Sequence, residues 1–154
     1  MLAFFIVLQI VLLLFMLFHD WISVPPLNDI TALKSKDSTL YRLMGSFING
    51  SLVLIPLMLT LFYYSKPTIP FYIGLTVMAF YLLLTIGTIL SWWIPYLFGS
   101  SQKLKKQFSK FKNTHHFLPR YKDHIVPNTL HVILHLQVWI CLGLSFYFLI
   151  TKAN

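Results

Sequence analysis

Residues 70–93 read PFYIGLTVMAFYLLLTIGTILSWW and contain no charged side chain. A helix rises about 1.5 Å per residue, so about 20 apolar residues cross the roughly 30 Å hydrocarbon core of a membrane. The stretch is long enough for one crossing and predicts a membrane-spanning helix. The 154-residue chain agrees, because 57% of it is hydrophobic and only 10% is charged. A soluble domain carries about 25% charged residues, so the composition excludes an ordinary soluble fold.

Three further apolar stretches lie at about 2–18, 43–64 and 128–150. Each approaches or exceeds the length of one crossing. The sequence therefore predicts an all-α integral membrane protein in which residues 1–154 form one membrane domain, a bundle of four transmembrane helices. No basic residues precede the first stretch and no small-residue cleavage motif follows it. We therefore expect a retained span and not a secretory signal.

Positive charge gathers in two of the connections between these stretches. The chain has 12 Lys and Arg against 4 acidic residues, a formal net charge of +8, and most of the basic residues fall in the connections 19–42 and 94–127. Basic loops stay in the cytoplasm, so we expect both connections there and both termini outside, with the bacterial inner membrane as the location. Basic residues next to membrane spans interact with anionic lipid head groups. Because this explains the positive net charge, we expect no nucleic acid partner.

The most basic segment, residues 100–113, reads SSQKLKKQFSKFKN. Its apolar residues Leu104, Phe108 and Phe111 have helical spacing, with lysines between them. The pattern predicts a short basic helix on the membrane surface between the third and fourth spans. The alternative is a solvated loop that only fixes topology. In the first interpretation the lysines bind anionic lipid head groups, and these are Lys103, Lys105, Lys106, Lys110 and Lys112.

The histidines are the most informative polar residues in the chain. All six fall at the level of the basic connections, and His131 and His135 lie one helical turn apart at the start of the last apolar stretch. Residues four apart share one face of a helix, so both imidazoles can reach one metal ion or one polar ligand. Asn128 lies close to that face. Because unpaired polar groups are costly in lipid, we expect this face to point into the bundle.

Two hypotheses about function follow, and the sequence leaves a third open. The first is a binding protein that holds a polar ligand, a lipid head group or a partner subunit at the cytoplasmic face. Its site would be lined by His131, His135, Asn128, Arg42, Asn49, His19 and Asp20. The alternative is an enzyme that uses a transition metal or haem on a lipid-soluble substrate, with metal ligands among His131, His135, His115 and His116. The third is assembly into a homo-oligomer or a larger membrane complex.

The remaining sequence features exclude some kinds of chemistry and predict local structure. Cys141 is the only cysteine, which excludes an intramolecular disulfide and a CxxC redox pair. No Gly-rich phosphate loop and no serine nucleophile elbow occurs in the sequence. Asn28-Asp29 predicts a turn or the cap of a short helix in the first connection. The aromatic residues Trp21, Trp92, Trp93 and Tyr96 are interpreted as a belt at the inner membrane boundary.

Overall fold

A computed structural model describes residues 1–152 and is helical, with no strand in this part of the chain. The longer helices are α1 (Leu2–Phe18), α3 (Thr39–Phe62), α4 (Phe71–Thr88) and α7 (Thr129–Lys152). A π-helical segment, η1 (Ile89–Trp93), and α5 (Ile94–Phe98) continue directly from α4. The short helices α2 (Ile30–Lys36), α6 (Gln102–Phe108) and the 3-10 turn η2 (Ser109–Phe111) belong to the connections.

Within residues 1–152, three helices are long and apolar enough to cross a membrane: Thr39–Phe62, Phe71–Phe98 and Thr129–Thr151. This supports an integral membrane protein, as the composition predicted. The first apolar stretch is also a helix, but α1 has 17 residues. At about 1.5 Å per residue it is about 26 Å long, slightly less than the roughly 30 Å of a hydrocarbon core.

The helix boundaries differ from the predicted spans at two places. First, α3 begins at Thr39 and not at residue 43, because the Ser38 side chain caps it by accepting a hydrogen bond from Tyr41 N. Arg42 therefore lies inside the helix. There it is tolerated because its guanidinium lies over the Trp21 ring, 4.2 Å from the ring centroid, and donates to the carbonyl oxygen of Asp20.

Second, the third helix continues past residue 93 as far as Phe98. Pro95 has no backbone N–H and cannot complete a regular α-helical ladder. The preceding residues, Ile89–Trp93, form a π-helix, whose wider turn lets the helix pass through the proline without ending. The helix stops at Gly99, which has a φ of 89°, a conformation that glycine adopts readily.

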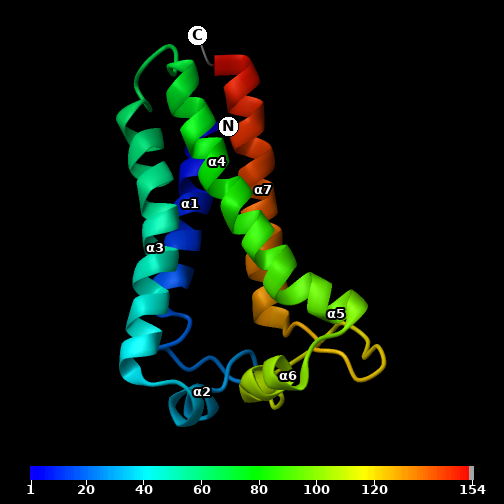
Figure 1. The fold of residues 1–154 in the computed structure, drawn as a ribbon. Helices are drawn as coiled ribbons and strands as arrows, with labels where there is room; N and C mark the ends of the chain where they lie inside the picture. The colour runs from blue at the N-terminus through cyan, green and yellow to red at the C-terminus, as the bar shows by residue number, and fades with distance from the viewer. Residues whose placement is uncertain (153–154) are drawn as a thin grey trace.

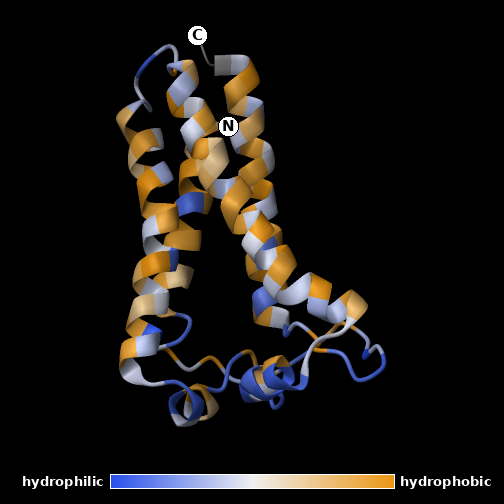
Figure 2. Cartoon of the chain, in the orientation of Figure 1, coloured by the Kyte–Doolittle hydropathy of each residue, from blue (hydrophilic) through white to orange (hydrophobic). Residues whose placement is uncertain are grey.

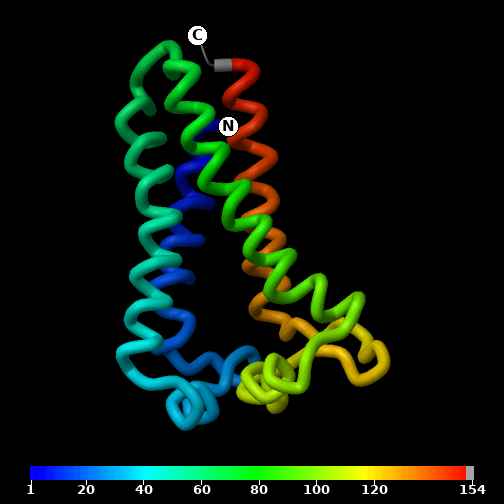
Figure 3. The backbone as a smooth tube through the Cα atoms, in the orientation of Figure 1, coloured from blue at the N-terminus to red at the C-terminus, as the bar shows by residue number. Residues whose placement is uncertain are grey.

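The longer helices pack in an order that brings the ends of the chain together. α1 packs against α3 and α7, and α4 packs against α3 and α7. Figure 1 shows the start of α1 and the end of α7 near the same end of the molecule. The opposite end, called the loop end here, is formed by residues 19–38 and 99–128. Figures 1 and 3 show α3 and α7 drawing apart toward the loop end, where α2 and α6 lie.

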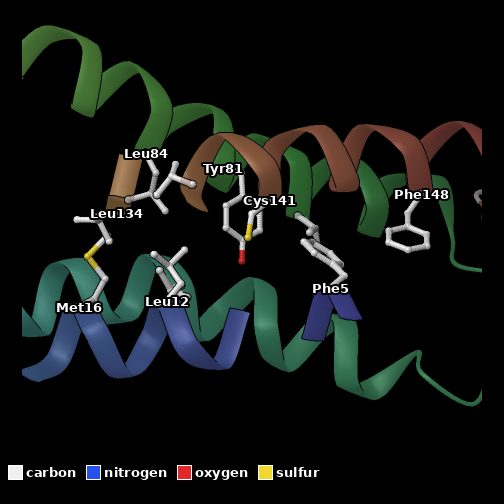
Figure 4. Packing of buried hydrophobic residues seen from close by; sticks show 11 residues of the cluster. Phe5, Leu12, Met16, Tyr81, Leu84, Leu134, Cys141 and Phe148 are labelled. Carbon is white, nitrogen blue, oxygen red and sulfur yellow. The ribbon is translucent and has the colours of Figure 1, made fainter. Parts of the chain in front are cut away.

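Apolar side chains fill the space between the helices and also cover the outside. Phe5, Leu12, Tyr81 and Cys141 belong to one buried cluster between α1, α4 and α7 (Figure 4). Large apolar side chains such as Phe47 on α3 are exposed on the outside of the long helices. Figure 2 shows this apolar character over the long helices and hydrophilic residues at the loop end. Such an outer surface suits contact with lipid and not with water.

The loop end is tied together by hydrogen bonds between its connections. Asp29 caps α2 by accepting from Ala32 N, which confirms the predicted cap. The two connections meet where His115 N donates to the Pro26 carbonyl oxygen at 2.8 Å. An ion pair between Lys110 and Asp37 joins η2 to the end of α2. The segments that follow α1 and precede α7 are therefore held against each other.

Candidate functional site

Asn128 fixes the start of α7 and the ring of His131. Its side-chain Oδ1 accepts from His131 N at 3.0 Å and from His131 Nδ1 at 2.5 Å. Its Nδ2 donates to Leu27 O and Thr114 Oγ1. An amide oxygen accepts and cannot donate, so His131 Nδ1 carries the proton and, in the neutral ring, Nε2 carries the lone pair. Asn128 was predicted to contact a ligand, but here all four of these hydrogen bonds are internal.

Aromatic rings enclose the imidazole of His131. The ring centroid of Trp92 lies 4.1 Å from that of His131 at an interplanar angle of 35°. Phe111 lies 4.9 Å away, edge to face, and His19 lies 6.1 Å away. These neighbours come from η1, η2 and α1, so the start of α7 is the place where the loop end and the helices meet.

His135 lies one turn further along α7 and is more deeply buried, with 1% of its surface exposed. Its ring centroid lies 6.2 Å from that of His131, 6.0 Å from Trp92 and 6.2 Å from Trp93. Its Nδ1 atom is buried without a hydrogen-bond partner. A buried polar atom left in this state costs about 1–3 kcal/mol, and Trp93 Nε1 in the same region is also buried without a partner.

The π-helical segment explains why two successive tryptophans line this region. Neighbouring residues of an α-helix point about 100° apart, and the wider π turn reduces that angle. Trp92 contacts His131, while Trp93 lies 5.4 Å from Trp139 on the same side of α7. Trp92, interpreted from the sequence as part of a belt at the inner membrane boundary, is buried against His131. Pro95 was the available signal, because a proline following an apolar helix suggests a local distortion.

His19 and Asp20 lie beside the histidine pair at the end of α1. His19 Nδ1 lies 2.9 Å from the Phe15 carbonyl oxygen, and His19 Nε2 lies 3.3 Å from Asp20 Oδ1. The Asp20 carbonyl oxygen accepts from Arg42. Arg42 thus reaches the predicted site through Asp20, and its Nε atom is buried without a partner. Asn49 is half-buried, and within residues 1–152 no hydrogen bond connects it to these residues.

The histidines between residues 99 and 128 line a separate groove, called the basic groove here. It has a volume of about 640 Å³ and lies between residues 105 and 126. His115 Nδ1 lies 2.7 Å from Thr129 Oγ1, and His124 Nδ1 lies 2.7 Å from the Tyr96 carbonyl oxygen. The cationic and histidine side chains of its wall are Lys105, Lys112, His115, His116, Arg120, Lys122 and His124.

The basic groove contains one carboxylate, and that carboxylate is neutralised. Asp123 lines the groove and accepts from Lys105 Nζ at 2.5 Å. This hydrogen bond, together with the charge of Lys105, lowers the pKa of Asp123 below its ordinary value. Lys112, Arg120 and Lys122 are exposed. The groove therefore presents excess positive charge.

The predicted basic helix forms, but part of its apolar side contacts protein. α6 and η2 cover residues 102–111. Phe108 and Phe111 pack against Trp92, with ring centroids 4.6 and 5.3 Å away. Of the predicted lipid-binding lysines, Lys105 and Lys112 line the basic groove, Lys110 pairs with Asp37, and Lys103 and Lys106 are exposed.

The predicted metal ligands fall in two places. His131 and His135 are adjacent on α7, whereas His115 and His116 line the basic groove. Among the residues that the structure describes, no group of three or more His, Cys, Asp and Glu side chains is placed to hold a metal ion. No protein-family model, curated protein or solved structure matches the chain.

Proposed function

We propose that this chain is a small membrane protein that binds an anionic lipid head group in the basic groove. One observation carries the proposal: the groove has an excess of cationic side chains and lies where the helices end. Its exposed cations Lys112, Arg120 and Lys122 have no acidic neighbour in the wall except Asp123, which Lys105 engages. Lysine and especially arginine bind phosphate oxygens by charge-assisted hydrogen bonds.

The aromatic residues near these cations favour a lipid over a soluble anion. Tyr121 is exposed between Arg120 and Lys122 in the chain, with Lys122 Nζ 5.2 Å from its ring centroid, and Phe117 is exposed in the same segment. Exposed aromatic rings are common at the level of the lipid head groups. On the other side, Phe108 and Phe111 hold α6 against Trp92, so the lysines of α6 stay close to the ends of the helices.

The proposal includes a topology. In it, α1, α3, α4 with its continuation, and α7 form a bundle of four transmembrane helices. The basic loop end faces the cytoplasm of a bacterial inner membrane, and the termini lie outside. The surface charge of the cytoplasmic leaflet attracts each nearby Lys or Arg with about 1 kcal/mol. A homo-oligomer or a larger complex that covers the groove is the competing explanation of its charge.

The experiment is an analysis of the lipids that stay bound after purification in mild detergent. We compare the wild type with the variant Lys112→Gln/Arg120→Gln/Lys122→Gln by native mass spectrometry. The control variant Lys34→Gln/Lys36→Gln/Lys66→Gln removes the same charge from exposed lysines outside the groove. We expect anionic phospholipid on the wild type and control only. Equal lipid on all three proteins, or a protein subunit in place of lipid, would overturn the proposal.

The alternative expectation of a metal-dependent enzyme has one observation in its favour, the adjacent buried imidazoles of His131 and His135. Binding of a metal ion there would be a first requirement of such chemistry. Phe111 lines the basic groove and also contacts His131, while neither His131 nor His135 lines the groove. The two sites can therefore be tested independently.

A further inference from the structure

We propose that the imidazoles of His131 and His135 together bind one copper(I) ion beside the rings of Trp92 and Trp93. The inference goes beyond lipid binding, because neither histidine lines the basic groove. It also makes the metal expectation specific, since it names two ligands, one ion and its oxidation state.

The spacing of the two rings fits a shared ion. An imidazole nitrogen binds a first-row metal ion at about 2 Å, so two rings on opposite sides of one ion have centroids about 6 Å apart. The centroids of His131 and His135 are 6.2 Å apart. Because the two residues occupy successive turns of α7, the helix itself holds this separation.

Each ring has a nitrogen that is free to bind a metal ion. His131 Nδ1 donates to Asn128 Oδ1 at 2.5 Å, which leaves the lone pair on Nε2. A hydrogen bond from the second ring nitrogen to an oxygen is the usual arrangement of a metal-binding histidine, because it fixes the ring. His135 supplies an independent observation, since its Nδ1 is buried without a partner in a side chain that is 1% exposed.

The surroundings favour a monovalent ion of low coordination number. Zinc takes four ligands, and within the described residues no group of three or more His, Cys, Asp and Glu side chains is placed to hold a metal ion. The His19 ring lies 6.1 Å from that of His131, but its Nδ1 lies beside the Phe15 carbonyl oxygen and its Nε2 beside Asp20 Oδ1. Copper(I) forms stable complexes with two opposed nitrogen ligands. Its single charge is also easier to bury than that of a divalent ion, because the Born energy rises with the square of the charge. Lys110, whose Nζ lies 5.3 Å from the centroid of the Phe111 ring, is paired with Asp37.

The tryptophans also favour a copper(I) ion at this site, and their fluorescence can report its binding. The Trp92 centroid lies 4.1 Å from the His131 ring and 6.0 Å from the His135 ring. Indole faces attract cations when water is excluded. A copper(I) ion held between the two imidazoles would lie close to this indole and quench its fluorescence.

The test is an anaerobic titration of the purified full chain with copper(I), using a chromophoric chelator as competitor and tryptophan fluorescence as the second readout. We expect one ion per wild-type chain, with quenching, and an affinity at least a hundredfold weaker in His131→Gln and in His135→Gln. The controls are His115→Gln, from the basic groove, and Cys141→Ser, which removes the only thiol. Both should bind like the wild type.

X-ray absorption of the copper(I)-loaded wild type keeps the test decisive if a histidine variant fails to fold. We expect two nitrogen ligands and no sulfur ligand. No binding to the wild type, equal binding to a folded His131→Gln/His135→Gln variant, or a spectrum with sulfur would overturn the proposal. Tighter binding of zinc(II) than of copper(I) at the same histidines would also overturn it, because a buried site with two ligands should favour the ion of lower charge and lower coordination number.

Discussion

The side chain of Asn128 caps α7 and binds the ring of His131 with the same oxygen atom, at 3.0 Å from His131 N and 2.5 Å from His131 Nδ1. The start of the last helix and the orientation of one imidazole are therefore set by a single residue. The amide nitrogen extends this arrangement to both connections, because it donates to Leu27 O and Thr114 Oγ1.

Replacing Asn128 should destabilise the protein and loosen the start of α7. Loss of a helix cap costs about 0.5–2 kcal/mol, and each buried partner left unsatisfied costs about 1–3 kcal/mol. We expect Asn128→Ala to unfold at a clearly lower temperature in detergent. Asn128→Ser keeps a capping oxygen and should lose less. Equal stability of Asn128→Ala and the wild type would show that the cap contributes little.

Trp92 of η1 should be the aromatic residue that contributes most to packing between the loop end and the start of α7. It contacts His131, Phe108 and Phe111, and removing a buried tryptophan side chain costs about 3–5 kcal/mol. We expect Trp92→Ala to lower the melting temperature and to raise amide hydrogen exchange in α6 and in the first turn of α7. Phe98→Ala is the control, because Phe98 is 80% exposed. Similar effects of the two substitutions would contradict the packing described here.

The pair formed by Lys105 and Asp123 should be visible in a pH titration. The hydrogen bond from Lys105 and its charge lower the pKa of Asp123 in the folded protein. Since the folded pKa is the lower one, the stabilisation is complete above the unfolded pKa and disappears as the pH falls through the folded pKa. We expect the carboxyl carbon of Asp123, followed by NMR, to titrate at a higher pH in Lys105→Gln. An unchanged midpoint would mean that the pair does not form in solution.

The proposed topology predicts opposite accessibility for two lysine positions. Lys112 lies at the loop end and Lys66 lies in the connection between α3 and α4. In a Cys141→Ser background, a cysteine introduced by Lys112→Cys should be labelled only after the membrane is opened. A cysteine introduced by Lys66→Cys should react from outside in intact cells. The reverse pattern would place the basic loop end outside the cell and would contradict the proposed topology.

Much of the helical fold could be predicted because apolar length and charge determine where a chain can cross a membrane. The stretches at 43–64, 70–93 and 128–150 all correspond to long apolar helices. Their boundaries were less accessible from sequence, since they depend on particular contacts. The first connection was predicted to end at residue 42, but the cap at Ser38 starts α3 at Thr39, and Arg42 is held in the helix by Trp21 and Asp20.

The candidate sites were predictable only in part, because helical spacing can be read from the sequence but the path of a loop cannot. The spacing of His131 and His135 placed them on one helical face, and the structure puts their rings side by side. Whether histidines of residues 99–128 lie near this pair depends on the path of the loop. A loop has no periodic pattern from which that path could be predicted. His115 and His124 are bound to Thr129 and to the backbone of Tyr96, so they line the basic groove and are separate from the pair.

The most direct test of the account is the affinity of the basic groove for a lipid head group. Detergent-solubilised wild type, the Lys112→Gln/Arg120→Gln/Lys122→Gln variant and the Lys34→Gln/Lys36→Gln/Lys66→Gln control are titrated with a short-chain phosphatidylglycerol. Phosphatidylcholine and inorganic phosphate serve as the comparison ligands.

A charge-assisted hydrogen bond to a phosphate oxygen contributes about 1.5 kcal/mol at the lower end of its range, so the loss of two such bonds corresponds to about a hundredfold in affinity. The account therefore predicts that the groove variant binds phosphatidylglycerol about a hundredfold more weakly, while the control binds it like the wild type and phosphatidylcholine binds none of them tightly. Equal affinity of the groove variant and the control, or a preference for inorganic phosphate over the lipid, would contradict it.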